Sequence, residues 1–149
     1  MDITDHYGVI YLKDGVRKDF TAIVKVNNPN ELVGWPGKAG IMVRNDITKS
    51  PSSPGYIILA VECWNGWSIQ WDSDGDGRLD NHTKFEGYSE WPNWLKLEKK
   101  GAIFTGYYSI NGLDWNKIAA VKPSKANLTQ DIGMFACRSR VEFENFAMS

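Results

Sequence analysis

Residues 55–71 read GYIILAVECWNGWSIQW, an apolar run followed by a turn and a second apolar run. Tyr56–Glu62 has the length and the β-branched and aromatic content of a strand, and Trp67–Trp71 has the same character. Asn65-Gly66 between them is a dipeptide that favours a tight hairpin turn. The stretch therefore predicts two antiparallel strands joined by a hairpin.

The rest of the chain repeats this pattern of short apolar runs separated by turn residues, and no segment has a sustained helical period. Lys99–Ala102, for example, reads KKGA and predicts a second hairpin. We predict an all-β fold of about ten antiparallel strands in two sheets. The other eight strands are Tyr7–Leu12, Phe20–Val26, Ala39–Arg44, Trp94–Glu98, Ile103–Ser109, Trp115–Val121, Ile132–Cys137 and Val141–Met148.

The length and charge of the chain limit what kind of protein it is. A chain of 149 residues predicts a single domain, 1–149, burying about 68–70 % of the surface of its unfolded chain. The net charge of −1 gives no electrostatic reason to expect a nucleic-acid partner, and no apolar run is long enough for membrane insertion. Cys63 and Cys137 could pair or be small buried hydrophobic residues. The opening residues carry no signal peptide, and we expect a domain excised from a larger secreted protein.

Strand alternation predicts which polar side chains point away from the core. If Ile69 faces inward, Trp67 and Trp71 do too, and Gln70 faces outward. Similarly, Leu95 and Leu97 point inward. Applied to all strands, the alternation predicts one polar outward face that could bind saccharide hydroxyls, and the alternative is a solvated sheet face. This face carries Arg44, Glu62, Gln70, Lys96 and Tyr107.

Residues 72–80, DSDGDGRLD, follow the strand pattern with four aspartates in nine positions. The string matches the calcium-loop pattern D-x-D-x-D-G, in which alternate carboxylates bind the ion and the glycine permits a sharp turn. Magnesium is disfavoured because it prefers few protein ligands and keeps its own waters. The predicted Ca²⁺ ligands are Asp72, Asp74, Asp76, the carbonyl of Arg78, and Asp80.

The loop departs from a helix–loop–helix calcium site in two respects. Position twelve, normally a bidentate carboxylate, is Thr83, so Glu86 is the nearest candidate for the last ligand. No helical pattern lies on either side. We expect a structural Ca²⁺ that fixes the loop at one end of a sheet, and the alternative is a solvated acidic turn.

Candidate enzymatic residues do not form a catalytic pattern. A glycosidase of this architecture uses E-x-D-x-E on one strand, whereas the nearest string here, Glu142-Phe143-Glu144, has only two carboxylates. His6 and His82 have no recognisable serine or cysteine partner. We predict that the domain is not an enzyme.

Seven tryptophans in 149 residues are an unusual number, and sugar rings stack on indoles. Trp64, Trp91 and Trp94 lie at strand ends or in loops, where stacking platforms occur, and Trp35 precedes a Pro-Gly turn. We predict Trp64, Trp91 and Trp94 as saccharide contacts, and place Trp67, Trp71 and Trp115 in the core.

Four stretches carry a resemblance to a known family: WPGKAGIMVRND (35–46), residues 55–71, WLKLEKKGAIFTGYYSINGLDWNKI (94–118) and IGMFACRSRVEFENFAMS (132–149). They resemble the concanavalin A-like modules appended to bacterial glycoside hydrolases and polysaccharide lyases. That group includes carbohydrate-binding module family 66, which recognises fructans, and the regulation-of-enolase protein 1 type. The resemblance implies a jelly-roll sandwich with a non-catalytic, sugar-binding role.

Individual family positions can be matched to this chain. Arg44 occupies the family's arginine, Tyr107 matches the first tyrosine of its G-Y-Y-S, and Lys96 stands where arginine is commoner. Asn111-Gly112 replaces Asp-Gly, and Glu144 replaces an aspartate. The acidic 72–80 loop is not a general feature of the family.

Together these observations predict a secreted or cell-surface, calcium-stabilised module that binds polysaccharide or oligosaccharide and targets a covalently linked catalytic domain. Two other functions stay open at this point. One is a structural or protein-interaction sandwich like laminin G domains, and the other is a stand-alone glycan hydrolase.

Overall fold

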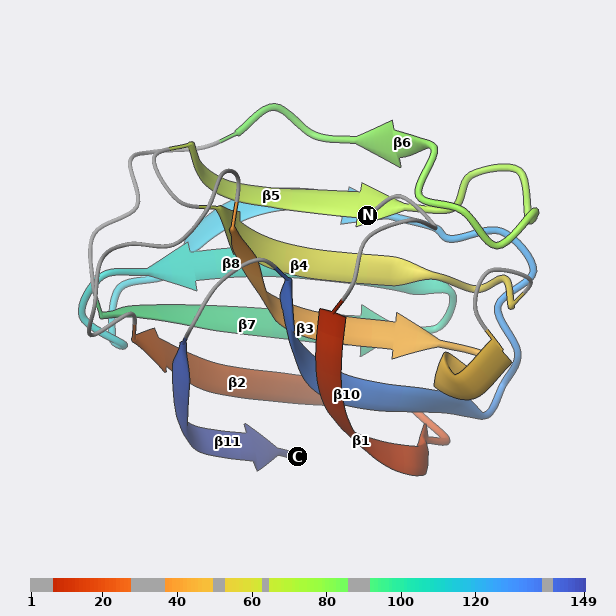
Figure 1. Ribbon diagram of the computed structural model, residues 1–149, viewed down its shortest axis with the longest axis horizontal. Coiled ribbons are helices and arrows are strands. Elements are labelled where there is room, and N and C mark those ends of the chain that lie inside the picture. Colours follow the sequence, from red (N-terminus) through yellow and green to blue (C-terminus); the bar gives the residue numbers. More distant parts are fainter. Residues whose placement is uncertain (1–6, 28–36, 50–52, 63–64, 86–91, 138–140) are drawn as a thin grey trace.

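In the residues that it describes, the computed structural model has eleven strands in two antiparallel sheets, packed face to face as a jelly-roll sandwich (Figure 1). It describes residues 7–27, 37–49, 53–62, 65–85, 92–137 and 141–149. In these ranges the only helical element is one 3₁₀ turn, η1 (Ile47–Lys49), and no helix is long and apolar enough to cross a membrane.

Sheet A has six strands in the order β1-β10-β3-β4-β5-β6, so its sequence neighbours β3, β4 and β5 lie side by side. Its strands are β1 (Tyr7–Val16), β10 (Gln130–Cys137), β3 (Lys38–Arg44), β4 (Ile57–Glu62), β5 (Gly66–Trp71) and β6 (Asn81–His82).

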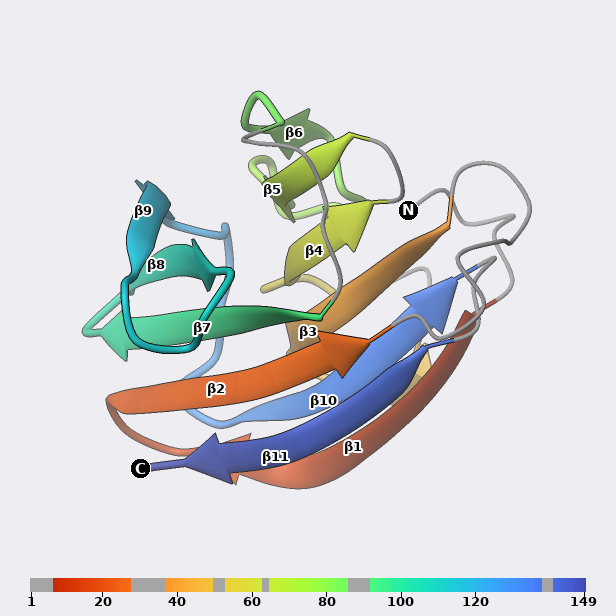
Figure 2. The ribbon, with the colours of Figure 1, turned by 90° about the vertical axis from the view of Figure 1, so that its left-hand side faces the viewer.

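Sheet B has five strands in the order β11-β2-β7-β8-β9, and it forms the second layer of the sandwich (Figure 2). Its strands are β11 (Glu142–Met148), β2 (Phe20–Asn27), β7 (Asn93–Lys100), β8 (Ile103–Ser109) and β9 (Asn116–Val121).

The main core lies between the sheets, and alternate residues of β2 and β7 are buried in it. Trp67 of β5 stacks on Tyr108 of β8 with ring centroids 4.2 Å apart, which joins the two layers. Gly106 of β8 leaves room for Ile69, since a Cβ at Gly106 would lie 2.6 Å from Ile69 Cδ1. Aromatic stacking and close aliphatic packing therefore both join β5 of sheet A to β8 of sheet B.

Sheet A also carries a second apolar cluster on its other face. Met42, Ile58 and Phe135 are each 0 % exposed there, and Leu79 from the acidic loop packs against them. Strands β3 and β4 of sheet A are thus buried on both faces, which explains why β4 reads as a continuous apolar run.

The predicted strands and both predicted hairpins are confirmed, including the pairing of Glu62 with Gly66 beside the turn. The two-residue strand β6 was not predicted, because Asn81 and His82 are polar, exposed and too few to give a pattern. Trp67 and Trp71 belong to the core or pack against it, as predicted. Cys137 is buried in the second cluster, and Cys63 is outside the described residues.

We predict that Gly40→Ala destabilises the protein by about 3 kcal/mol, because overpacking cannot be relieved inside a central strand pair. A Cβ at Gly40 would lie 1.9 Å from the main-chain oxygen of Leu59. The matched control is Gly8→Ala in edge strand β1, where a Cβ meets nothing within 4 Å. Urea unfolding of both variants measures the difference, and equal midpoints would contradict the close approach of β3 and β4.

Candidate functional site

The acidic loop 72–80 is a tightly wound turn at the end of β5, built around one buried carboxylate. Asp72 is 0 % exposed, and its two oxygens accept hydrogen bonds from the main-chain N–H groups of Gly75 (2.7 Å) and Gly77 (2.8 Å). Both glycines have positive φ, 82° and 88°, a conformation that costs other residues steric strain. The alternation of Asp and Gly in the sequence therefore winds the chain around Asp72.

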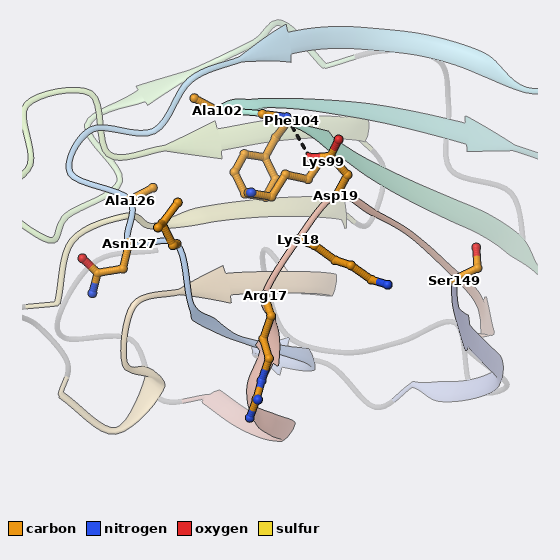
Figure 3. Close-up of a pocket in the computed structure, with 11 residues that line it drawn as sticks. Arg17, Lys18, Asp19, Lys99, Ala102, Phe104, Ala126, Asn127 and Ser149 are labelled. Carbon is orange, nitrogen blue, oxygen red and sulfur yellow. Dashed lines mark hydrogen bonds between the residues drawn. The ribbon is translucent and has the colours of Figure 1, made fainter.

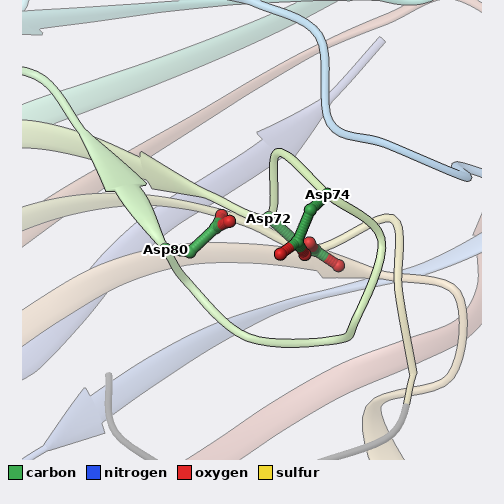
Figure 4. Close-up of side chains that lie close together, drawn as sticks. All are labelled: Asp72, Asp74 and Asp80. Atoms are coloured by element: carbon green, nitrogen blue, oxygen red, sulfur yellow. The ribbon is translucent and has the colours of Figure 1, made fainter.

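Three carboxylates of the loop converge. Asp72, Asp74 and Asp80 each offer an oxygen, and these oxygens lie within 4.8 Å of one another (Figure 4). Ca²⁺ binds oxygens at about 2.3–2.6 Å, so two ligands on opposite sides of the ion are about 5 Å apart. The spacing of the three aspartates fits a hard cation of that size.

Hydrogen bonds and neighbouring charges shift the pKa values of two carboxyl groups in this cluster, Asp74 and Asp80. The amide of Ser73, which donates to Asp80, lowers the pKa of that carboxyl, and the Ser73 hydroxyl acts in the same direction. At Asp74 the amide of Asp76 lowers the pKa, but desolvation, a hydrogen bond with Asp72 and the charges of Asp76 and Asp80 together raise it above its ordinary value. The raised pKa of Asp74 reports negative oxygens that repel one another, and a bound cation would relieve that repulsion.

The other predicted metal ligands lie differently. Asp76 is exposed, is not in the converging group, and accepts a hydrogen bond from the amide of Arg78 (2.8 Å). Asp76 was predicted to bind the same ion as Asp72, but in this conformation of the loop it does not lie with the other three carboxylates. The carbonyl of Arg78 stays a prediction, and Glu86 is outside the described residues.

Arg44 has an internal role, which corrects its predicted role as a saccharide contact. It points away from the main core as expected, but it is only 1 % exposed. Its Nε donates to the carbonyl of Ser53 (2.8 Å), its Nη2 to that of Gly77 (2.6 Å), and its guanidinium lies 3.9 Å from the Tyr56 ring centroid. Strand alternation predicted the direction of the side chain but could not show that loops cover this face.

Two other predicted contacts also belong to sheet A. Glu62 is 5 % exposed and accepts a hydrogen bond from Asn65 (2.8 Å), while Gln70 is partly exposed and weakly contacts Ser68. Because Lys96 and Tyr107 are on sheet B, the prediction that all five polar residues share one face is wrong. Each sheet has its own outward face, which alternation within single strands does not reveal.

The outward face of sheet B gathers rings and ammonium groups. Lys96 of β7 pairs across the sheet with Tyr107 of β8, and its Nζ lies 4.3 Å from the Tyr107 ring centroid and 4.7 Å from that of Trp115. Beside this group, Lys25 Nζ of β2 lies 5.3 Å from the Trp94 ring centroid. We call Lys25, Trp94, Lys96, Tyr107 and Trp115 the aromatic face.

Carboxylates border the aromatic face. Glu98 is hydrogen-bonded to Tyr107 and thereby raises the pKa of that phenol. Glu144 of β11 forms an ion pair with Lys25 (3.2 Å). The face thus combines flat apolar surfaces, cationic donors and carboxylate acceptors, the combination that recognises polyhydroxylated rings.

The aromatic face contains two residues that the sequence analysis did not assign to it. Trp115 was placed in the core, but its partly exposed ring lies by Lys96, so that prediction is wrong. Lys25 alternates with the apolar residues of β2 and could have been found by the same reasoning that found Lys96. Trp64 and Trp91 lie outside the described residues, and their saccharide contacts stay predictions. Trp35 also lies outside the described residues.

No family model and no curated protein matches the chain. Solved structures do match: CBM66, a carbohydrate-binding module from Bacillus subtilis, superposes with a TM-score of 0.66 at 14 % identity, covering 98 % of this chain and 83 % of that one. The exoplasmic/lumenal domain of VIP36, solved with Ca²⁺ and Man3GlcNAc, gives 0.59 at 12 % identity over 97 % and 75 %. The GH43 protein BlXynB from Bacillus licheniformis gives 0.59 at 17 % identity over 95 % of this chain and 32 % of that one. These likenesses show a lectin-like jelly-roll fold.

We predict that Arg44→Ala lowers stability by about 3 kcal/mol, because it leaves buried carbonyls of two loops without their charged donor. The control is Arg17→Ala, since Arg17 is exposed and bonds only the nearby Asp14 carbonyl. Thermal unfolding of the two variants gives the comparison. An Arg44→Ala protein as stable as the control would contradict the internal role.

Proposed function

We propose that the protein is a non-catalytic carbohydrate-binding module whose saccharide surface is the aromatic face of sheet B. The observation that carries the proposal is the convergence of two tryptophans, one tyrosine and two lysines on one outward face. None of these five residues belongs to the hydrophobic core between the sheets. The fold likeness to CBM66 and to VIP36 supports the same class of ligand.

We expect different residues of the aromatic face to contact different parts of a sugar. Trp94 and Trp115 supply aromatic surface for the C–H side of a sugar, and Lys25 and Lys96, whose ammonium groups lie over these rings, supply donors for its hydroxyls. A lysine ammonium is a point charge and does not reproduce the planar, bidentate fork of arginine. We therefore expect Lys96 to contribute less directional selectivity than an arginine at this position.

We propose that the acidic loop binds Ca²⁺ through Asp72, Asp74 and Asp80. The donor set fits, since three hard carboxylate oxygens already lie within 4.8 Å of one another. Main-chain carbonyls, Asp76 after a small rearrangement and water are available for the remaining positions of a six- to eight-coordinate ion. When bound, the ion would neutralise the loop and rigidify its connection to β5 and to the second apolar cluster through Leu79.

We further propose that the module belongs to a larger secreted protein and targets a linked catalytic domain to polysaccharide. The match to BlXynB supports this, because nearly all of this chain corresponds to one third of that longer protein. A single aromatic face gives weak binding, and attachment to an enzyme or to further modules would raise the effective affinity.

We predict that Trp115→Ala and Trp94→Ala each weaken saccharide binding roughly tenfold, because a central aromatic anchor is lost. Affinity electrophoresis on a panel of fructan, xylan, β-glucan and mannan identifies the ligand, and calorimetry with the best oligosaccharide measures the effect. Phe85→Ala, which removes another exposed ring, is the matched control.

Three outcomes would contradict this proposal. Retention by none of the polysaccharides, together with retention of a protein partner, would favour the structural sandwich. Release of reducing sugar from soluble glucans or fructans would show a hydrolase. Equal losses for Phe85→Ala and Trp115→Ala would place the saccharide elsewhere.

We predict that Ca²⁺ at one hundred times its Kd stabilises the protein by about 2.7 kcal/mol, or roughly 5–10 °C in Tm. Asp74→Asn removes one ligand charge but keeps an oxygen that can accept the Asp76 amide, so the variant should fold and lose most of the increase. Asp114→Asn, an exposed aspartate outside the acidic loop, should keep it. Differential scanning calorimetry with Ca²⁺ and with chelator compares them, and identical curves for the unmodified protein would argue for a solvated turn.

A further inference from the structure

At one end of the sandwich the chain forms an open pocket of about 750 Å³ that is distinct from both sites above (Figure 3). Its walls come from three connections: the β1–β2 turn with Arg17 to Asp19, the β7–β8 turn with Gly101 and Ala102, and residues 126–128. A volume of this size suits a small organic ligand.

One wall of the pocket holds a buried lysine. Lys99 is 7 % exposed, because its position in β7 alternates inward with Leu95 and Leu97. No residue that the structure describes accepts a hydrogen bond from Lys99 Nζ or pairs with it through a carboxylate within 4.0 Å. Lys99 Nζ is not among the buried side-chain polar atoms that lack a partner in the described part of the chain, so the ammonium reaches the pocket and is available there to an anion from outside the chain.

The one carboxylate side chain of the pocket does not neutralise this ammonium. Asp19 instead accepts a hydrogen bond from the main-chain N–H of Gly101 (2.8 Å), which fixes the β1–β2 turn against the β7–β8 turn. Exposed Arg17 and Lys18 add two further positive charges at the same pocket. The side chains lining it therefore comprise three cations and one anion.

The remaining walls are largely apolar. Phe104 is fully buried behind the pocket, Leu128 is 86 % exposed at its rim, and Ala102 and Ala126 add further apolar surface. Asn127 and Ser149 are the polar residues of these walls. Figure 3 shows Lys99, Asp19 and Phe104 gathered together, with Ala126 and Asn127 on a separate segment beside them. A cation at the base of apolar walls matches a molecule with an anionic group on an apolar body.

We propose that this pocket binds a small amphipathic carboxylate, whose carboxylate group pairs with Lys99 Nζ and whose apolar part packs on Leu128 and Ala126. The site is separate from the aromatic face. Lys99 lies five residues beyond Trp94 along β7, which is a separation of about 16 Å along the strand. Its side chain points to the opposite side of the sheet. The proposed carboxylate site does not depend on the saccharide or calcium proposals.

The test is an NMR titration of the ¹⁵N-labelled protein with 4-phenylbutyrate and with its neutral amide, 4-phenylbutyramide. We expect the acid to shift the amide signals of Ala102, Ala126 and Leu128, and to bind roughly tenfold more tightly than the neutral amide because only the acid forms the ion pair. D-Glucuronate, which carries a carboxylate on a polar body, should bind more weakly than 4-phenylbutyrate.

Lys99→Met keeps the length of the side chain and removes its charge, so it should abolish the preference for the acid while leaving the dispersed spectrum of a folded protein. Lys99→Gln serves the same purpose if the methionine variant does not fold. Lys100→Met, at the exposed neighbouring position, should bind both probes as the unmodified protein does.

Equal affinity for acid and amide would overturn the proposal, and would mean that the lysine ammonium only reaches water at the pocket mouth. The absence of shifts at these amides with millimolar 4-phenylbutyrate would overturn it as well. Preferential binding of D-glucuronate would contradict the apolar part of the ligand.

Discussion

The main chain around Gly77 lies between two buried, oppositely charged side chains, and the acidic loop depends on this arrangement. Asp72 accepts the Gly77 N–H, and Arg44 donates to the Gly77 carbonyl. Each charge is almost fully buried, so each needs strong hydrogen-bond partners to offset its desolvation. The peptide groups supply them, and the loop is thereby fixed to β3 on one side and β5 on the other.

This constraint explains why the two outward faces of the sandwich differ. On sheet A, the loops that Arg44 fixes cover the end of the sheet, and Leu79 and Ile47 seal an apolar cluster there. Among the residues that the structure describes, sheet B has no comparable cluster, and its outward residues in β7 are only partly buried. The proposed saccharide surface of rings and charges is therefore accessible on sheet B.

Features that depend on residues close together in the sequence could be predicted, whereas features that depend on residues far apart in the sequence could not. Strands, hairpins and the inward direction of Leu95 and Leu97 are local properties, and alternation predicted them. The acidic loop was also predictable, because the Asp–Gly spacing itself forces the turn that brings Asp72, Asp74 and Asp80 together. The roles of Arg44 and Trp115 were mispredicted because both depend on segments distant in sequence: Arg44 is covered by Ser53 and Gly77, and Trp115 meets Lys96 across the β7–β8–β9 arrangement.

The aromatic face depends on strand register. The presence of tryptophan and lysine in the sequence is not enough to form this face, because the pairing of the strands determines which side chains lie together. Lys96 contacts Tyr107 because these two residues are paired in the register of β7 and β8. Lys25 lies across from Trp94 because these two residues are paired in the register of β2 and β7. A shift of one residue in either pairing would turn these side chains into the core and bring apolar residues out. Two core contacts resist such a shift: Trp67 stacks on Tyr108, and Ile69 packs against Gly106. Both Tyr108 and Gly106 belong to β8, so these contacts fix the position of that strand. The inner packing of sheet B thus sets the positions of the rings on its outer surface. A cavity in that core is therefore expected to weaken the proposed saccharide contacts, although none of the core residues belongs to the aromatic face.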